Sequence, residues 1–268
     1  MVKKPGSQPS PSLVRLRERA TLPPARPRAV LTLGPEHVAI GSIETALALH
    51  LVQARLPLRD AGGAWQVFGP VNESLAAIAE WLDQQGLGGR WRGELLDVTD
   101  ANRRPVAAIE RAAVRPLGIA TFAVHLVCCR ADGSVWVQQR ALDKATDPGQ
   151  WDTTMGGQVG AGESSVDTLV RETWEEAGLQ PAQLQGLRYV EVISVRRPVH
   201  EGYLVEQIDV YEAAVADAVR PQNQDGEVHC FECLSPAEVA ARLSAEAFTL
   251  EAALILWAWL ERRPTGFR

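Results

Sequence analysis

The chain has 268 residues and a mass of 29.2 kDa, which suits one large domain or two small ones. Its hydrophobic content of 46% and charged content of 22% are typical of globular proteins, and they exclude collagen-like and wholly disordered chains. The net charge of −6, from 27 Lys and Arg against 33 Asp and Glu, argues against nucleic acid and anionic membranes as partners.

Residues 1–28 are predicted to be a flexible tail, with at most a short helix around Leu13–Arg19. They are basic, contain six prolines and show no apolar periodicity. No apolar segment of the kind found in secretion signals follows the first lysines, and the four cysteines do not form a disulfide framework. We therefore expect a soluble, cytoplasmic protein that can lose residues 1–25 with little effect.

Residues 29–115 are predicted to be a small α+β module. The pattern favours two helices, one over 44–53 and one that Asn72 caps and Gly86 ends. Apolar runs and turn residues indicate strands at 29–33, 37–43, 65–69, 94–98 and 105–110. No catalytic spacing occurs here. A short connection around 111–116 without Gly or Ser predicts that the module docks on the next domain and walls its substrate pocket.

Residues 116–268 are predicted to form an α/β/α sandwich with a mixed sheet. Strands are expected at 118–129 and 135–140 around a turn at 131–134, and then at 187–195, 203–211 and 227–233. Helices are expected at 236–244 and 250–262. The second of these contains the longest apolar run of the chain, 252–260, which is shorter than the about 20 residues that a membrane span needs.

The segment 157–179, GQVGAGESSVDTLVRETWEEAGL, carries the chemistry. Ser164 followed by Asp167 predicts a capped helix start, and Gly178 predicts its left-handed end. Apolar residues recur along this helix at the spacing of one packing stripe: Val166, Leu169, Val170 and Thr173.

Glu172, Glu175 and Glu176 recur at helical spacing, so their carboxylates are predicted to share one helix face. Their mutual repulsion would be relieved by a hard cation, and oxygen ligands suit Mg²⁺ or Mn²⁺. The glycines before the helix, among them Gly156 and Gly157, allow the backbone to approach a metal or a phosphate closely.

This combination resembles the Nudix box, G-x5-E-x7-R-E-U-x-E-E-x-G-U, in which U is bulky and apolar. All its fixed positions are present, with Thr173 at the first U as the one departure: Gly157, Glu163, Arg171, Glu172, Glu175, Glu176, Gly178 and Leu179. The resemblance implies a Nudix fold over 116–268 and hydrolysis of a diphosphate.

By the same resemblance, Glu172, Glu175, Glu176 and the backbone carbonyl of Gly156 are expected to bind the metal. Arg171 would hold the glutamates in place, and Glu163 would fix the glycine loop.

Two residues compete for the role of general base, Glu172 in the box and Glu227 on a later loop. Around them, Arg140 and Lys144 could contact a substrate phosphate, His125 could contact the substrate, Trp151 could stack on an aromatic ring, and Gly157 could approach the phosphates.

A narrower resemblance spans about 30–262. Segments such as 110–119, 116–163 and 225–228 look like the Nudix domains fused to thiamine pyrophosphokinase in some eukaryotes and like their stand-alone relatives. This implies thiamine diphosphate, or its damaged oxo and oxy forms, as a small-molecule substrate.

The alternative is a pyrophosphatase of ADP-ribose or a nucleotide sugar. Isopentenyl-diphosphate isomerase shares the pattern but uses a cysteine in the glycine loop, where this chain has Met155-Gly156-Gly157. A non-catalytic Nudix binding module is disfavoured by the complete box. The oligomeric state, homodimer included, is left open.

Overall fold

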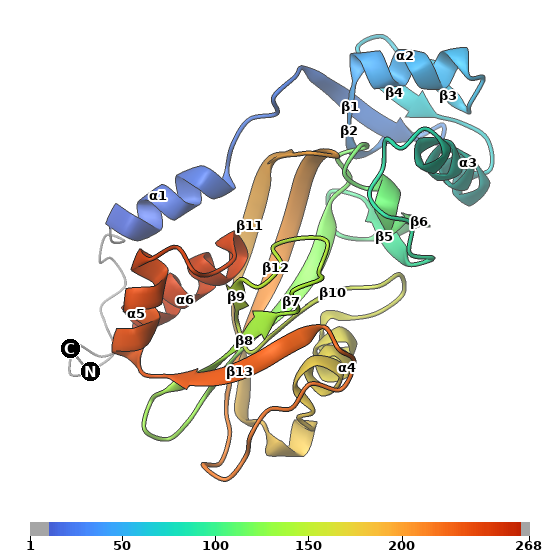
Figure 1. Cartoon of the computed structure of the whole chain (residues 1–268). Coiled ribbons are helices and arrows are strands. Elements are labelled where there is room, and N and C mark those ends of the chain that lie inside the picture. Colours follow the sequence, from blue (N-terminus) through green and yellow to red (C-terminus); the bar gives the residue numbers. More distant parts are fainter. Residues whose placement is uncertain (1–10, 264–268) are drawn as a thin grey trace.

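A seven-stranded mixed sheet forms the centre of the structure, a computed structural model that describes residues 11–263 (Figure 1). The strand order is β11-β12-β7-β8-β13, with β10 added to β7 and β9 to β8. β7 and β12 run parallel, and the other pairs are antiparallel. The strands are β7 (Thr121–Cys129), β8 (Val135–Arg140), β9 (Trp151–Asp152), β10 (Met155–Gln158), β11 (Gln185–Val199), β12 (Gly202–Ala214) and β13 (Val228–Leu234).

Helices cover both faces of this sheet, as the predicted α/β/α sandwich requires. Successive residues of β7 point to opposite faces: Ala123 and Val127 pack with the C-terminal helices, whereas Val124 and Leu126 pack with α4. Because both faces are covered, β7 is mostly apolar on both of them, with Thr121 and His125 as buried polar residues. The helices are α4 (Ser165–Ala177), α5 (Pro236–Ser244) and α6 (Leu250–Arg262), with a short 3-10 turn η2 (Pro181–Gln183).

The N-terminal residues build a separate core beside the large sheet (Figure 1). A four-stranded sheet in the order β2-β1-β4-β3 packs with two helices, and a β5–β6 hairpin follows. This agrees with the predicted α+β module; the domain boundary at 115/116 stays a prediction. The elements are β1 (Arg28–Leu33), β2 (Val38–Glu44), α2 (Thr45–Gln53), β3 (Leu58–Asp60), β4 (Ala64–Val67), α3 (Val71–Gln84), β5 (Leu95–Thr99), β6 (Pro105–Glu110) and η1 (Arg111–Ala113).

The prediction of a flexible tail over 1–28 needs correction from residue 11 onward; residues 1–10 lie outside the described part. The expected short helix is α1 (Pro11–Ala20), and it is docked on the protein. Leu13 and Ala20 are buried in the core that contains α6, and the Leu22 N–H donates to the Arg196 carbonyl at 2.8 Å. Burial of these apolar residues orders the segment, although its composition resembles that of disordered chains.

Two further local expectations were wrong. Asn72 does not cap α3, which starts at Val71 after Pro70; its Oδ1 instead accepts from the Ala108 N–H of β6 at 3.0 Å. The stripe predicted on α4 is only half buried, because Val166 and Val170 are exposed. The spacing of these residues is helical, but the face turned to the sheet is the one that carries Thr168, Leu169, Thr173, Glu176 and Ala177.

Among the helices formed by residues 11–263, none combines the length and the apolar character that crossing a membrane would require.

Candidate active site

Helix α4 begins and ends as its sequence predicts. The Ser164 side chain accepts from the Asp167 N–H and Asp167 returns the contact, so the capping box is confirmed. Gly178 has a φ of 63° and closes the helix in the left-handed conformation. These two ends fix which residues face the sheet, and they place the glutamates of the helix along one wall of a cavity.

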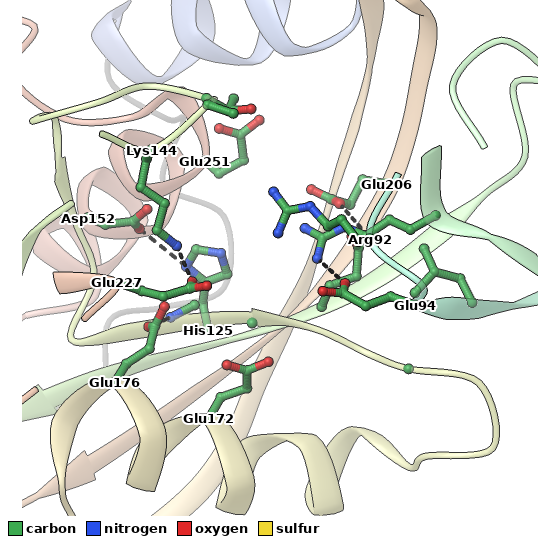
Figure 2. A pocket seen from close by; sticks show the side chains of 18 of the residues that line it. Arg92, Glu94, His125, Lys144, Asp152, Glu172, Glu176, Glu206, Glu227 and Glu251 are labelled. Atoms are coloured by element: carbon green, nitrogen blue, oxygen red, sulfur yellow. Dashed lines mark hydrogen bonds and ion pairs between the residues drawn. The ribbon is translucent and has the colours of Figure 1, made fainter. Parts of the chain in front are cut away.

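This cavity, of about 740 Å³, lies between α4, the large sheet and the N-terminal module. Figure 2 shows Glu172 and Glu176 rising from the helix, Lys144, Asp152 and Glu227 on one side, and Arg92 and Glu94 on the other. Nearly all predicted site residues line it: His125, Arg140, Lys144, Gly156, Gly157, Glu163, Arg171, Glu172, Glu175, Glu176 and Glu227.

Trp151 is the exception, and its predicted role in stacking on a substrate is not supported. It is absent from the cavity lining. Its ring packs against the C-terminal helical core and lies under the Arg242 guanidinium, 4.3 Å from ring centre to Cζ. Strand β9 holds the residue there, because the Trp151 N–H and C=O bond Ala247 and Thr249.

Arg171 holds two of the three α4 glutamates, and the third has its own partners. Nη1 of Arg171 donates to Glu172 at 2.9 Å and to Glu175 at 3.0 Å. Glu176, which is 3% exposed, accepts from Gln138 Nε2 at 2.9 Å and from the Gly156 N–H at 3.1 Å. Among residues 11–263, no three acidic, His or Cys side chains are gathered as a ready-made metal site.

Burial makes two of these carboxyl groups harder to ionise. It raises the pKa of Glu172 to about 7, against the opposing effect of Arg171. It raises the pKa of Glu176 to about 8, against the hydrogen bonds from Gly156 and Gln138. Glu163 behaves oppositely: hydrogen bonds from Arg171, and further ones from Thr168 and Gly160, hold its pKa at about 2 although burial opposes them. A cation at the first two carboxylates would compensate their charge.

The glycine loop lies directly against these groups. A Cβ added at Gly157 would stand 2.2 Å from Cγ and Cδ of Glu172, and one at Gly156 would stand 2.6 Å from Cε1 of His125. Only glycine permits this approach without displacement of a neighbour. The backbone of β10 thus borders the carboxylates, and its predicted approach to a metal or a phosphate stays a prediction.

His125 and Asp152 form a buried pair behind the loop. The Thr153 hydroxyl donates to the Met155 carbonyl at 2.8 Å, so it accepts from His125 Nδ1, also at 2.8 Å. Burial lowers the pKa of His125 despite Asp152, whose Oδ1 lies 3.6 Å away. The ring is therefore neutral at pH 7, with Nε2 as an acceptor.

Two loops meet at the cavity through Lys144 and Glu227. Lys144 Nζ bonds Glu227 Oε2, and the Ala141 N–H donates to the Glu227 carbonyl at 2.9 Å. Burial would raise the pKa of Glu227, but the Lys144 ammonium outweighs it and the pKa lies below its ordinary value. Glu227 is accordingly ionised and faces the same cavity as Glu172, so both candidates for the base are in place.

Sequence reasoning missed the residues that the N-terminal module, β12 and α6 add to the cavity. They come from segments with no catalytic spacing, and only tertiary structure brings them to the α4 glutamates: Arg92, Glu94, Arg111, Arg115, Glu206 and Glu251. The one usable signal was the short connection at 111–116, which predicted a docked module. The Ala161 N–H, in the glycine-rich loop before α4, donates to the Leu95 carbonyl of β5 at 2.9 Å, so the two parts touch at the site.

Known proteins are similar to this chain in sequence. Nudix hydrolase 20, chloroplastic, from Arabidopsis thaliana is 30% identical over 179 residues, which are 65% of this chain and 48% of that protein. The chain thus spans about half the length of that relative. An isopentenyl-diphosphate Delta-isomerase from Streptomyces coelicolor is 30% identical over 160 residues, 58% of this chain and 78% of that protein.

The fold has a counterpart among solved structures. The crystal structure of DR0079 from Deinococcus radiodurans superimposes with a TM-score of 0.50 and 23% identity over 61% of this chain and 97% of that one, a likeness of fold alone. The family model of the NUDIX domain matches residues 120–254, half of the chain, and so runs from β7 to the start of α6 and includes α4. With that match and the complete box on α4, the chain belongs to the Nudix family.

Proposed function

We propose that the protein is a metal-dependent hydrolase that cleaves a diphosphate linkage. The observation that carries this proposal is the placement of Glu172, Glu175 and Glu176 on one helix, along a cavity large enough for a small-molecule diphosphate.

The donor set fits a hard divalent cation, with Mg²⁺ or Mn²⁺ proposed. Carboxylate oxygens are the ligands these ions prefer, and burial raises the pKa values of Glu172 and Glu176, so a bound cation would favour their ionised forms. The Gly156 carbonyl is proposed as a further ligand. When bound, such an ion neutralises phosphate oxygens and makes water a better nucleophile.

The chain's own residues would orient the groups and move the proton. Arg171 keeps Glu172 and Glu175 in fixed positions through Nη1. Either Glu172 or Glu227 accepts the proton of the attacking water; Glu172 is favoured, because Glu227 is engaged by Lys144 and its lowered pKa makes it the weaker base. Lys144 and Arg140 are proposed to contact phosphate oxygens.

For the substrate we propose thiamine diphosphate or its damaged oxo and oxy forms, with the monophosphate as product. This rests on the sequence resemblance to Nudix domains fused to thiamine pyrophosphokinase. From the net charge of −6 we propose that neither nucleic acid nor an anionic membrane is a partner, and a cytoplasmic location stays a proposal from the sequence.

Isomerisation of an isopentenyl diphosphate is the reaction suggested by the second relative. We place it below hydrolysis because none of the four cysteines of the chain lines the cavity, and Met155-Gly156-Gly157 occupies the loop where the isomerase resemblance requires a cysteine.

The test is a panel of diphosphates with purified protein and Mg²⁺: thiamine diphosphate, oxythiamine diphosphate, ADP-ribose, nucleotide sugars and isopentenyl diphosphate. Release of thiamine monophosphate or its oxy analogue with the highest kcat/KM is expected. Preference for ADP-ribose would overturn the substrate but keep the reaction, and turnover of isopentenyl diphosphate alone would overturn both.

A further inference from the structure

The cavity has one basic side chain without an acidic partner, and it comes from the N-terminal module. Seven arginines and lysines line the cavity: Arg92, Arg111, Arg115, Arg140, Lys144, Arg171 and Arg197. Six of them form ion pairs with glutamates or aspartates. Within residues 11–263, no acidic side chain pairs with the Arg92 guanidinium, which faces the cavity beside Glu94 (Figure 2).

The backbone that carries Arg92 is tied down on both sides. The Arg92 N–H donates to Oε1 of Glu110, a carboxylate that is 4% exposed, at 3.0 Å. The Gly89 N–H donates to the Ala112 carbonyl at 2.9 Å, and the Arg111 N–H to the Glu94 carbonyl at 2.8 Å. Arg92 therefore extends from a fixed segment, and the entropy lost when it binds a ligand is restricted to its side chain.

The same segment is hydrogen-bonded to the glycine-rich loop that precedes α4. Strand β5 follows Arg92 in the chain. The Ala161 N–H donates to the Leu95 carbonyl of β5, and the Gly162 N–H donates to Oδ2 of Asp97 at 3.1 Å. Arg92 and Glu227 line opposite sides of the same cavity (Figure 2). Burial and Lys144 have the larger effects on the pKa of Glu227, and the charge of Arg92 adds to its lowering. The guanidinium is thus positioned between the module and the proposed reaction centre.

We propose that Arg92 is a specificity-determining residue that binds a non-bridging oxygen of the second phosphate of the substrate, the one not held at the α4 carboxylates. This rests on the proposed function. Acidic side chains outnumber basic ones in the lining, so a diphosphate brought into the cavity needs positive charge beyond the metal. A planar guanidinium that is not already paired with a carboxylate can donate two parallel hydrogen bonds to a phosphate.

The experiment compares Arg92→Gln with Arg90→Gln in the full-length protein. Arg90 is exposed, lies two residues earlier and does not line the cavity, so its substitution removes the same charge without touching the site. Isothermal titration calorimetry with Mg²⁺ measures the affinity for methylene diphosphonate, a non-hydrolysable diphosphate, and for inorganic phosphate. Thermal unfolding of each variant checks that the fold is kept.

For Arg92→Gln we expect at least a tenfold weaker affinity for the diphosphonate, with little change for inorganic phosphate. Arg90→Gln should match the wild type, and Arg92→Lys should retain part of the affinity because it keeps the charge but loses the planar fork. With a turned-over substrate, Arg92→Gln should raise KM and leave kcat nearly unchanged.

Equal diphosphonate affinity in Arg92→Gln and the wild type would overturn the inference and leave the proposed function standing. An equal loss for both ligands would also overturn it, since Arg92 would then act on anions in general. If the wild type bound no diphosphonate with Mg²⁺, the proposed function itself would fail, and the role of Arg92 with it.

Discussion

Arg171 holds Glu163 through two parallel hydrogen bonds, Nε to Oε1 at 2.9 Å and Nη2 to Oε2 at 2.8 Å. Glu163 belongs to the glycine loop and Arg171 to α4, so this fork joins the loop to the helix. The remaining nitrogen of Arg171 contacts Glu172 and Glu175. One side chain therefore sets the position of the loop and of two proposed metal ligands.

Arg171→Lys tests this connection. Lysine keeps the charge but cannot make the fork to Glu163 and the bridge to Glu172 and Glu175 at once. We expect the Mg²⁺ concentration for half-maximal activity to rise about tenfold or more, as is typical when a residue that orients metal ligands is lost. Arg188→Lys, at the exposed pair with Glu212, is the control. An unchanged Mg²⁺ requirement would show that Arg171 does not position the ligands.

The identity of the base is tested by Glu172→Gln and Glu227→Gln side by side. We expect kcat to fall about 10²–10⁴-fold in Glu172→Gln, and Glu227→Gln to lose less, because Lys144 already neutralises that carboxylate. Stopped-assay kinetics at saturating metal separate loss of the base from loss of metal binding. The reverse order, with the larger kcat loss in Glu227→Gln, would assign the proton to the later loop.

The docking of α1 is tested by Leu13→Ala, with Val14→Ala as the matched control. Leu13 is 2% exposed and Val14 is 39% exposed. Deleting the buried side chain should lower the free energy of unfolding by about 2–4 kcal/mol, and the exposed one by about 0.5 kcal/mol or less. Urea unfolding gives both values. If the two variants were equally stable, α1 would not be part of the core in solution, and residues 1–25 would be dispensable as the sequence predicted.

The raised pKa of Glu206 predicts that the stability of the folded protein depends on pH. Burial, reinforced by Glu251, raises its pKa to about 7, from 4.5 in the unfolded chain. The native state therefore loses stability as pH rises from 4.5 through 7, because the carboxylate must ionise where it is disfavoured. Glu206→Gln removes this loss and can still accept from Thr121 and Gln158.

The Gln variant should unfold like the wild type at pH 4.5 and be more stable at pH 8, on the order of 1–2 kcal/mol. That figure is set below the full pKa difference because Glu206 lines the cavity and is only half-buried. Exposed Glu36→Gln serves as the control. A variant no more stable than the wild type at pH 8 would show that Glu206 ionises without penalty.

Local chemistry explains which parts of the structure were predictable. α4 begins after Ser164 and ends at Gly178, as expected, because an N-cap and a left-handed glycine depend only on neighbouring residues in the chain. Helical spacing placed Val166 and Leu169 on one stripe, but spacing does not say which face meets the sheet, and Val166 is exposed.

Only the residues that the Nudix box contributes to the cavity were predictable from the sequence. Glu172 and Glu176 follow from their position on one helix, whereas Arg92 and Glu206 reach the cavity through packing of segments far apart in sequence. Trp151 was misjudged for a related reason: an aromatic residue beside the glycine loop can face either the cavity or the core, and β9 turns it to the core.

The most direct test of the central claim is the rate of diphosphate hydrolysis by the wild type and by Glu176→Gln, each with Mg²⁺ and with EDTA. Glu176 is buried at the cavity wall, and the Gln variant can keep its contacts with Gln138 and Gly156 after an amide flip, so the fold should persist. We predict that EDTA abolishes wild-type activity, that added Mg²⁺ or Mn²⁺ restores it, and that Glu176→Gln loses about 10²-fold or more in kcat. Full wild-type activity in chelator, or a near-normal rate in Glu176→Gln, would contradict a metal-dependent reaction at the α4 carboxylates.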